Sequence, residues 1–151
     1  MSQKIFAENN IAHFNYFIKQ TIEAGISLQG WEVKSIRDNK VSIKEGYIIN
    51  KTGNIEIVGM HISPSQKTSI FSNIEPTRTR RLLLNRNEIN KIIGFNAENG
   101  QTVIPLKLYE TNGKIKLLIG FGVGKNQKDK RDTVKERDWK REQSRIMKKK
   151  N

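Results

Sequence analysis

Cysteine is absent from all 151 residues of the sequence, which excludes disulfides, thiolate zinc sites and a thiol nucleophile. The two histidines, His13 and His61, lie far apart, and no group of His, Asp and Glu has the spacing of a metal site or an acid–base pair. No apolar run approaches the roughly 20 residues of a membrane span, and the first ten residues are too polar for a signal peptide. We therefore expect a cytoplasmic, monomeric binding protein that has no metal, no cofactor and no catalytic residue.

Acidic residues are too few to balance the basic ones. The 28 Lys and Arg exceed the 15 Asp and Glu, which gives a formal net charge of +13 and a pI of about 10.1. Residues 124–151 hold twelve of the basic and five of the acidic residues, so just over half of the net charge lies in this short segment. The expected partner is a polyanion, with nucleic acid first and an anionic membrane surface second.

Residues 124–151 also contain little apolar surface. Their large apolar side chains are Val134, Trp139, Ile146 and Met147. Because so little burial cannot offset the entropy of ordering the backbone, we expect this segment to be disordered when free. Glu136 and Lys140, four residues apart, nevertheless favour a helix, on which Trp139 and Ile146 would share one face. The pattern indicates either a basic arm that folds on a polyanion or a solvated charged tail.

Residues 1–123 form the other predicted unit, a folded body. Alternating apolar and β-branched residues predict strands at 14–26, 41–49, 55–62, 103–109 and 115–121. Hairpin turns are predicted at 51–54 and at 111–113, where Asn112-Gly113 is the strongest turn signal in the chain. Five or six antiparallel strands with two or three short helices indicate a mainly β fold, a small antiparallel OB-like barrel.

Three stretches lack the pattern of a strand or helix. Residues 1–11 are polar and predicted to be loose, and residues 63–74 are predicted to form a surface loop. Gly120, Gly122 and Gly124 indicate a flexible exit from the body into the tail.

Residues 28–37 predict a short helix that carries an unusual charge. Glu32 falls within the apolar stripe of this helix. A carboxylate at such a position either lies at a solvated rim or is paired with a specific partner. A second helix is predicted after an N-cap at Asn87 and is expected to end at Gly94.

Arg78, Arg80 and Arg81 occur within four positions and are followed by three leucines at 82–84. This arrangement is typical of guanidinium groups directed at phosphates from a backbone that is anchored by apolar residues. The alternative is a basic loop that only keeps the surface soluble.

An ordered set of motifs extends over nearly the whole chain. The motifs are Glu-Ala-Gly-Ile at 23–26, Gln-Gly-Trp-Glu-Val-Lys-Ser at 29–35, Pro-Thr-Arg-Thr-Arg-Arg-Leu-Leu-Leu at 76–84, Val-Ile-Pro-Leu at 103–106, Gly-Lys at 124–125, Asp-Lys-Arg at 129–131, Arg-Asp-Trp at 137–139 and Arg-Ile-Met-Lys at 145–148. Together they resemble the small protein B (SmpB) family, the tmRNA-binding proteins of bacterial trans-translation.

The resemblance implies that an OB-like barrel, residues 1–123, grips the tRNA-like domain of tmRNA. The tmRNA-binding residues that it implies are Asn9, Glu32, Lys34, Ser35, Arg37, Arg78, Arg80, Arg81 and Lys125. In this role Glu32 would accept hydrogen bonds from base or ribose donors at the RNA surface.

The resemblance further implies that residues 124–151 enter the vacant mRNA channel of a stalled ribosome and become helical there. The ribosome-binding residues that it implies are Lys128, Asp129, Lys130, Arg131, Arg137, Trp139, Arg141, Arg145, Ile146 and Met147. The implied partners are tmRNA, the ribosome at its small-subunit decoding centre and mRNA channel, and elongation factor Tu together with the tmRNA. No membrane partner is implied.

The sequence departs from the family pattern at Asn10, Ile11, Asn126 and Lys128, where basic or aromatic residues are usual. Each lost phosphate partner is expected to weaken RNA affinity modestly. Two other functions fit the composition less well. One is an rRNA-associated barrel with a basic extension. The other is a small RNA-processing enzyme, for which the sequence offers no cluster of catalytic residues.

Overall fold

Two long strands, β8 (Gln101–Thr111) and β9 (Lys114–Gly124), pair along their whole length and support the rest of the body. The computed structural model describes residues 3–65 and 74–149. The other strands are β1 (Lys4–Glu8), β2 (Tyr16–Ile26), β3 (Val41–Ser42), β4 (Tyr47–Lys51), β5 (Asn54–Val58), β6 (His61–Ile62) and β7 (Arg80–Leu83). The helices are α1 (Ile11–Asn15), α2 (Gly30–Arg37), α3 (Arg86–Asn96) and α4 (Gln127–Lys149).

The main sheet has seven antiparallel strands in the order β1-β8-β9-β2-β7-β5-β4, and β3 pairs with β6 in a separate ladder. This confirms the predicted mainly β, antiparallel fold. Within the described residues, β1 and β4 stand at opposite ends of the sheet and do not pair with each other. The sheet is therefore not closed, and the predicted OB-like barrel is not confirmed.

Both predicted hairpins are present as two-residue turns. Thr111 pairs with Lys114 across Asn112-Gly113, whose φ angles are 51° and 76°. Lys51 pairs with Asn54 across a turn with φ angles of 48° and 87°. Positive φ at both central residues matches the twist of the flanking strands, and asparagine and glycine tolerate it best.

The N-terminal predictions are wrong in two places. Residues 1–11 are not loose throughout, because β1 pairs with the edge of β8 and Phe6 is buried in the core. The strand predicted at 14–26 begins only at Tyr16, since residues 11–15 form α1. Neither feature could be recognised from the neighbouring residues in the sequence. The polar edge strand β1 is stabilised by its pairing with β8, about a hundred residues away.

The two runs predicted at 41–49 and 55–62 are each interrupted. The first is broken by a turn in which the Gly46 amide donates to the Ile43 carbonyl at 3.0 Å. The second is broken at Gly59, where φ is +83° and a Cβ atom would lie 2.5 Å from the Glu45 carbonyl oxygen. Of the loop predicted at 63–74, residues 66–73 lie outside the described residues.

Helix α3 begins earlier and ends later than predicted. Its N-cap is Asn85, whose side chain accepts from the Glu88 amide while Glu88 accepts from the Asn85 amide. This reciprocal pair is a capping box, and it replaces the predicted cap at Asn87. The helix continues through Gly94 to Asn96 and packs on the sheet through an edge-to-face contact of Phe95 with Phe121, 5.0 Å between ring centroids.

Gly120 and Gly122 lie inside β9 and do not form a flexible exit. A Cβ atom on Gly120 would lie 2.7 Å from Leu106, and one on Gly122 would lie 3.0 Å from Tyr16. Because these glycines have no side chain, Leu106 of β8 and Tyr16 of β2 can pack directly against the backbone of β9. The prediction of a loose segment here was wrong because the glycines serve packing between strands.

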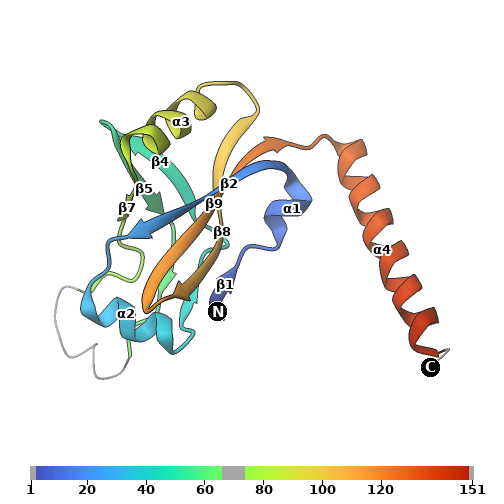
Figure 1. The fold of residues 1–151 in the computed structure, drawn as a ribbon, viewed down its shortest axis with the longest axis horizontal. Coiled ribbons are helices and arrows are strands. Elements are labelled where there is room, and N and C mark those ends of the chain that lie inside the picture. Colours follow the sequence, from blue (N-terminus) through green and yellow to red (C-terminus); the bar gives the residue numbers. More distant parts are fainter. Residues whose placement is uncertain (1–2, 66–73, 150–151) are drawn as a thin grey trace.

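Helix α4 stands apart from the body and ends far from it (Figure 1). Its described residues contribute nothing to either buried apolar cluster of the protein. The helical conformation is the one expected of the bound tail, and the disorder expected of the free tail stays a prediction. In the described part of the chain, no helix is long and apolar enough to cross a membrane.

Candidate nucleic-acid interface

Glu32 lies at the centre of a buried cluster of charges. It occupies the N3 position of α2, where its Oε1 atom accepts from the Gln29 amide at 2.7 Å in a capping box. The same oxygen accepts from Nη2 of Arg78 at 2.6 Å, and Oε2 accepts from Nε of Arg80 at 2.6 Å. Although the two arginines lie more than 40 residues away in sequence, the fold places both guanidinium groups on one carboxylate.

Arg80 is as deeply buried as its partner, with both side chains 0% exposed. Its Nη1 atom donates to the Met60 carbonyl at 2.6 Å and its Nη2 atom to the Pro76 carbonyl at 3.1 Å, and Nη2 also lies 2.6 Å from Oε2 of Glu32. The guanidinium thereby links α2 to Met60, which lies between β5 and β6, and to Pro76 in the segment before β7. Because this charge is paired and fully buried, it organises the fold and is out of reach of a phosphate.

Arg78 links this cluster to the surface. Its side chain is 29% exposed. Nη2 also donates to the Ser27 carbonyl at 3.3 Å, whereas its Nε atom is buried without a partner among the described residues. Of the three groups in the Glu32–Arg78–Arg80 cluster, Arg78 is the one that an RNA phosphate can approach.

The pKa of Glu32 reflects two opposing effects. Burial raises it, but hydrogen bonds from Arg78, the Gln29 amide and Arg80, together with the Arg80 charge, outweigh burial and hold the pKa below its usual range. Burial also lowers the pKa of Arg80, against the opposing effect of Glu32. The guanidinium nevertheless stays protonated, because arginine does not lose its proton in proteins.

The low pKa of Glu32 predicts a specific acid sensitivity. Because the folded pKa lies below the unfolded value of about 4.3, the stabilisation by ionised Glu32 is complete above that value and is lost as pH falls through the folded pKa. In urea titrations from pH 7 to pH 3, the difference in unfolding free energy between wild type and Glu32→Gln should therefore shrink. A difference that stays constant over this range would contradict the prediction.

Four of the predicted tmRNA-binding residues are not on the surface. Glu32, Arg80, Ser35 and Asn9 are buried. Glu32 cannot be the predicted acceptor at the RNA surface, because both of its oxygens are used by arginines and the helix N-terminus. Asn9 instead ties the start of α1 to β8, with Nδ2 donating to the Pro105 carbonyl at 3.0 Å.

The exposed cations among the predicted tmRNA-binding residues of the body lie on or next to α2 and β7. Lys34, Arg37 and Arg81 are exposed, and Arg78 is partly exposed. Arg37 forms an ion pair with Glu110 at 3.0 Å, and half of its side chain remains accessible. The predicted tmRNA-binding residues of the body therefore fall into two groups. One group is buried and supports the fold, and the other consists of cations that are accessible to a polyanion.

Lys125 lies away from α2, at the junction between the body and α4. Its Nζ atom donates to the His13 carbonyl at 2.9 Å and to the Thr133 hydroxyl at 2.7 Å, and lies 4.8 Å from the centre of the Phe17 ring. Its backbone amide donates to the Asn15 carbonyl at 2.9 Å. These contacts of Lys125 hold the start of α4 against α1 and β2. Its binding to tmRNA stays a prediction.

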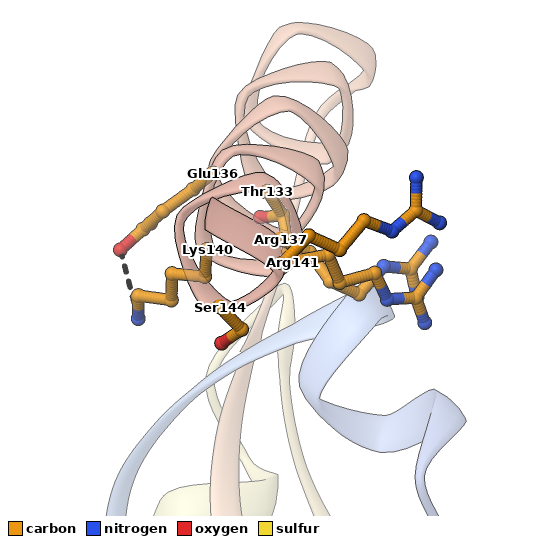
Figure 2. A pocket seen from close by; sticks show the side chains of 7 residues that line it. Thr133, Glu136, Arg137, Lys140, Arg141 and Ser144 are labelled. Carbon is orange, nitrogen blue, oxygen red and sulfur yellow. Dashed lines mark ion pairs between the residues drawn. The ribbon is translucent and has the colours of Figure 1, made fainter. Parts of the chain in front are cut away.

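Helix α4 carries three of its arginines on a different face from Trp139 and Ile146. Arg137, Arg141 and Arg145 follow each other at intervals of four residues, and Figure 2 shows the labelled arginines extending to the same side of the helix. Trp139 and Ile146, seven residues apart, are 63% and 43% exposed and occupy another face.

The remaining predicted tail residues also lie on α4. Lys128, Asp129, Lys130 and Arg131 form its first turns, and Met147 is 66% exposed near its end. Asn126 caps the helix, since its Oδ1 atom accepts a hydrogen bond from the Asp129 amide at 2.8 Å, and the Asp129 carboxylate accepts in return from the Asn126 amide at 3.4 Å. A negative charge at this end of a helix is stabilised by the helix dipole.

Among the described residues, no three His, Asp or Glu side chains come together as metal ligands. The exposed cations include the predicted ones around α2 and β7 and those along α4. A β-sheet body with exposed cations and a cationic helix outside its buried clusters defines a polyanion-binding protein of the nucleic-acid-binding class.

The chain belongs to the SmpB protein family, whose model matches residues 6–149. It is 51% identical over 150 residues to the SsrA-binding protein of Ruthia magnifica, covering 99% of this chain and 91% of the relative. It is also 51% identical over 142 residues to the SsrA-binding protein of Cupriavidus pinatubonensis, covering 94% and 95% of the two chains. These matches confirm the family that the motifs predicted.

A solved structure described as "tmRNA-SmpB: a journey to the center of the bacterial ribosome" is similar in fold, with a TM-score of 0.66 and 36% sequence identity. The match covers 84% of this chain and 92% of that chain. The likeness therefore extends over most of both proteins.

Proposed function

We propose that this chain binds the tRNA-like domain of tmRNA with its folded body and delivers that RNA to stalled ribosomes in trans-translation. The observation that carries the proposal is the family match over residues 6–149, which includes both the body and α4. The relatives are SsrA-binding proteins, and the similar solved structure concerns tmRNA, SmpB and the bacterial ribosome. The protein acts by binding and positioning, without catalysis, in the cytoplasm.

Within this proposal the body recognises the shape of a folded RNA. Lys34, Arg37, Arg78 and Arg81 supply the accessible cations, which position the RNA through its phosphates. Glu32 and Arg80 act indirectly, by fixing the backbone that carries Arg78. An OB-like arrangement of the strands remains part of the proposal, since such folds bind oligonucleotides on the sheet and its loops.

The tail acts separately from the body. We expect the first turns of α4, with Asp129, Lys130 and Arg131, to lie near the decoding centre. Trp139 and Ile146 then anchor the helix further along the empty mRNA channel, since their exposed face has no partner within the described part of the chain. Elongation factor Tu as a companion of the tmRNA stays a prediction.

A salt-dependent titration tests the body's specificity. Fluorescence titrations of the full chain with the tRNA-like domain and with an rRNA hairpin of matched length should give a dissociation constant at least about tenfold lower for the tRNA-like domain at physiological salt. Both affinities should fall with salt, because both include phosphate contacts. Equal affinities at every salt concentration would favour an rRNA-associated protein and contradict the proposal.

A further inference from the structure

The first two turns of α4 are docked on the body, and the rest of the helix is not. Asp129, Lys130, Thr133 and Val134 are partly buried, whereas every residue from 135 to 147 is exposed. The four partly buried residues recur after one helical turn, so they lie on one face, and α1 is in contact with α4. Figure 1 shows α4 running away from the body after the end of β9. The body therefore holds only the start of this helix.

Lys125 connects this start to the body. Its ammonium donates to the carbonyl of His13 in α1 at 2.9 Å and to the hydroxyl of Thr133 in the second turn of α4 at 2.7 Å. The same group lies 4.8 Å from the centre of the Phe17 ring in β2. Lys125 is partly buried, and water competes less for such a group than for a free surface lysine. One side chain thus joins α1, β2 and α4.

The start of α4 is also stabilised by its own residues. Asn126 and Asp129 exchange hydrogen bonds between side chain and backbone as a capping box, and the Thr133 hydroxyl donates to the Asp129 carbonyl at 2.9 Å. The amide of Lys130 donates to the Asn126 carbonyl at 3.1 Å, which closes the first turn. Residues 127–133 are therefore held by the cap at one end and by Lys125 at the other.

The formation of a helix is limited by its first turn. Forming that turn orders several residues for a single hydrogen bond, with a nucleation constant of about 10⁻³, whereas each further residue adds a hydrogen bond of its own. Residues 135–147 are exposed and gain no burial that would offset the cost of nucleation. A nucleus for α4 must therefore come from the residues before them.

We propose that this junction is a preformed helix nucleus in which Lys125 is the positioning residue. Lys125 keeps residues 127–133 helical in the free protein, so the ribosome has only to extend the helix through the residues that follow. This inference rests on the proposed function, because a stalled ribosome is the partner that extends the helix. The disorder expected of the free tail is then confined to the residues after Thr133.

The test compares the full-length wild type with four variants. Thr133→Val removes the hydroxyl without changing the charge or, to a first approximation, the helix propensity, and Thr133→Ser keeps a hydroxyl. Lys125→Gln removes the ammonium, and the control Lys135→Gln removes one exposed charge from α4. The Cα chemical shifts of the free protein measure the helix. Amide exchange gives less information here, because the first four amides of a helix have no helical acceptor.

In the wild type, the Cα shifts of residues 127–133 should be helical and those of residues 138–147 should be random coil. Thr133→Val and Lys125→Gln should each lower the helical equilibrium constant of residues 127–133 by about two- to tenfold, the effect of a lost hydrogen bond. Thr133→Ser and Lys135→Gln should keep the wild-type shifts.

Thr133→Val should bind tmRNA as the wild type does, since it removes no cation. It should need a concentration of its tmRNA complex up to about tenfold higher for half-maximal tagging on stalled ribosomes, because the ribosome must then form the nucleus itself. The maximal rate of tagging should stay the same, and Thr133→Ser should behave as the wild type.

Random-coil shifts at residues 127–133 in the wild type would overturn the nucleus, and so would helical shifts that survive both Thr133→Val and Lys125→Gln. Loss of these shifts in Thr133→Val with an unchanged half-maximal concentration would overturn the role of Lys125 in placing the tail. A wild type that does not tag stalled ribosomes would contradict the proposed function, and the chemical shifts would still decide whether the nucleus exists.

Discussion

Glu32→Ala should destabilise the body by about 3–5 kcal/mol, the usual cost of removing one partner from a buried ion pair. The substitution leaves Arg80 fully buried without its carboxylate, and it also removes a cap from α2. Since small proteins are stable by only about 5–15 kcal/mol, a loss of this size should be plain in urea or thermal unfolding.

Glu88→Ala is a matched control for this substitution. Glu88 holds the same N3 position in the capping box of α3, but its partners there are exposed backbone groups and no buried arginine contacts it. Its removal should cost about 1 kcal/mol. Similar costs for the two variants would show that Glu32 acts only as a helix cap.

The pair can also be tested by a double-mutant cycle. Glu32→Ala and Arg80→Ala together should cost less than the sum of the two single substitutions, because the double variant leaves neither charge alone in the interior. Additive costs would contradict the coupling between the two side chains.

Deleting residues 127–151 should leave a folded protein that binds tmRNA but does not support tagging on stalled ribosomes. The unfolding free energy of the body should change little, because the described residues of α4 contribute nothing to the buried clusters. The tRNA-like domain should bind the truncated chain within about tenfold of the full chain at 0.2 M salt, since long-range charge effects are largely screened there.

A double substitution that keeps the charge of the tail distinguishes the effect of its cations from the effect of its exposed apolar side chains. Trp139→Ala with Ile146→Ala preserves every cation of α4 but removes its exposed apolar face. This variant should bind tmRNA as the wild type does and lose most of its tagging in a translation assay with stalled ribosomes. Full tagging by the double variant would mean that charge alone places the tail, and tagging by the truncated chain would contradict any role for the tail.

The sequence was most informative where structure is determined locally. The turns at Thr52-Gly53 and Asn112-Gly113 were predictable because positive φ angles restrict the residues that fit them. The helical periodicity of α2 was likewise visible, and so was the unusual position of Glu32 within it.

The partners of Glu32 could not be predicted, because they come from a segment more than 40 residues away. The arginines at 78–81 looked like one phosphate-binding cluster, yet strand alternation in β7 turns Arg80 into the interior and Arg81 outward. The breaks at Gly46 and Gly59 were missed for a similar reason, since the close approach of Gly59 to Glu45 exists only after the chain has folded.

The most direct test of the division between body and tail is amide hydrogen exchange on the full chain, measured free, with the tRNA-like domain of tmRNA, and with that RNA on stalled ribosomes. The RNA alone should slow exchange around α2 and β7, while α4 exchanges rapidly until the ribosome is added. Slow exchange throughout α4 in the free protein, or protection of α4 but not of the body by the RNA, would contradict this division.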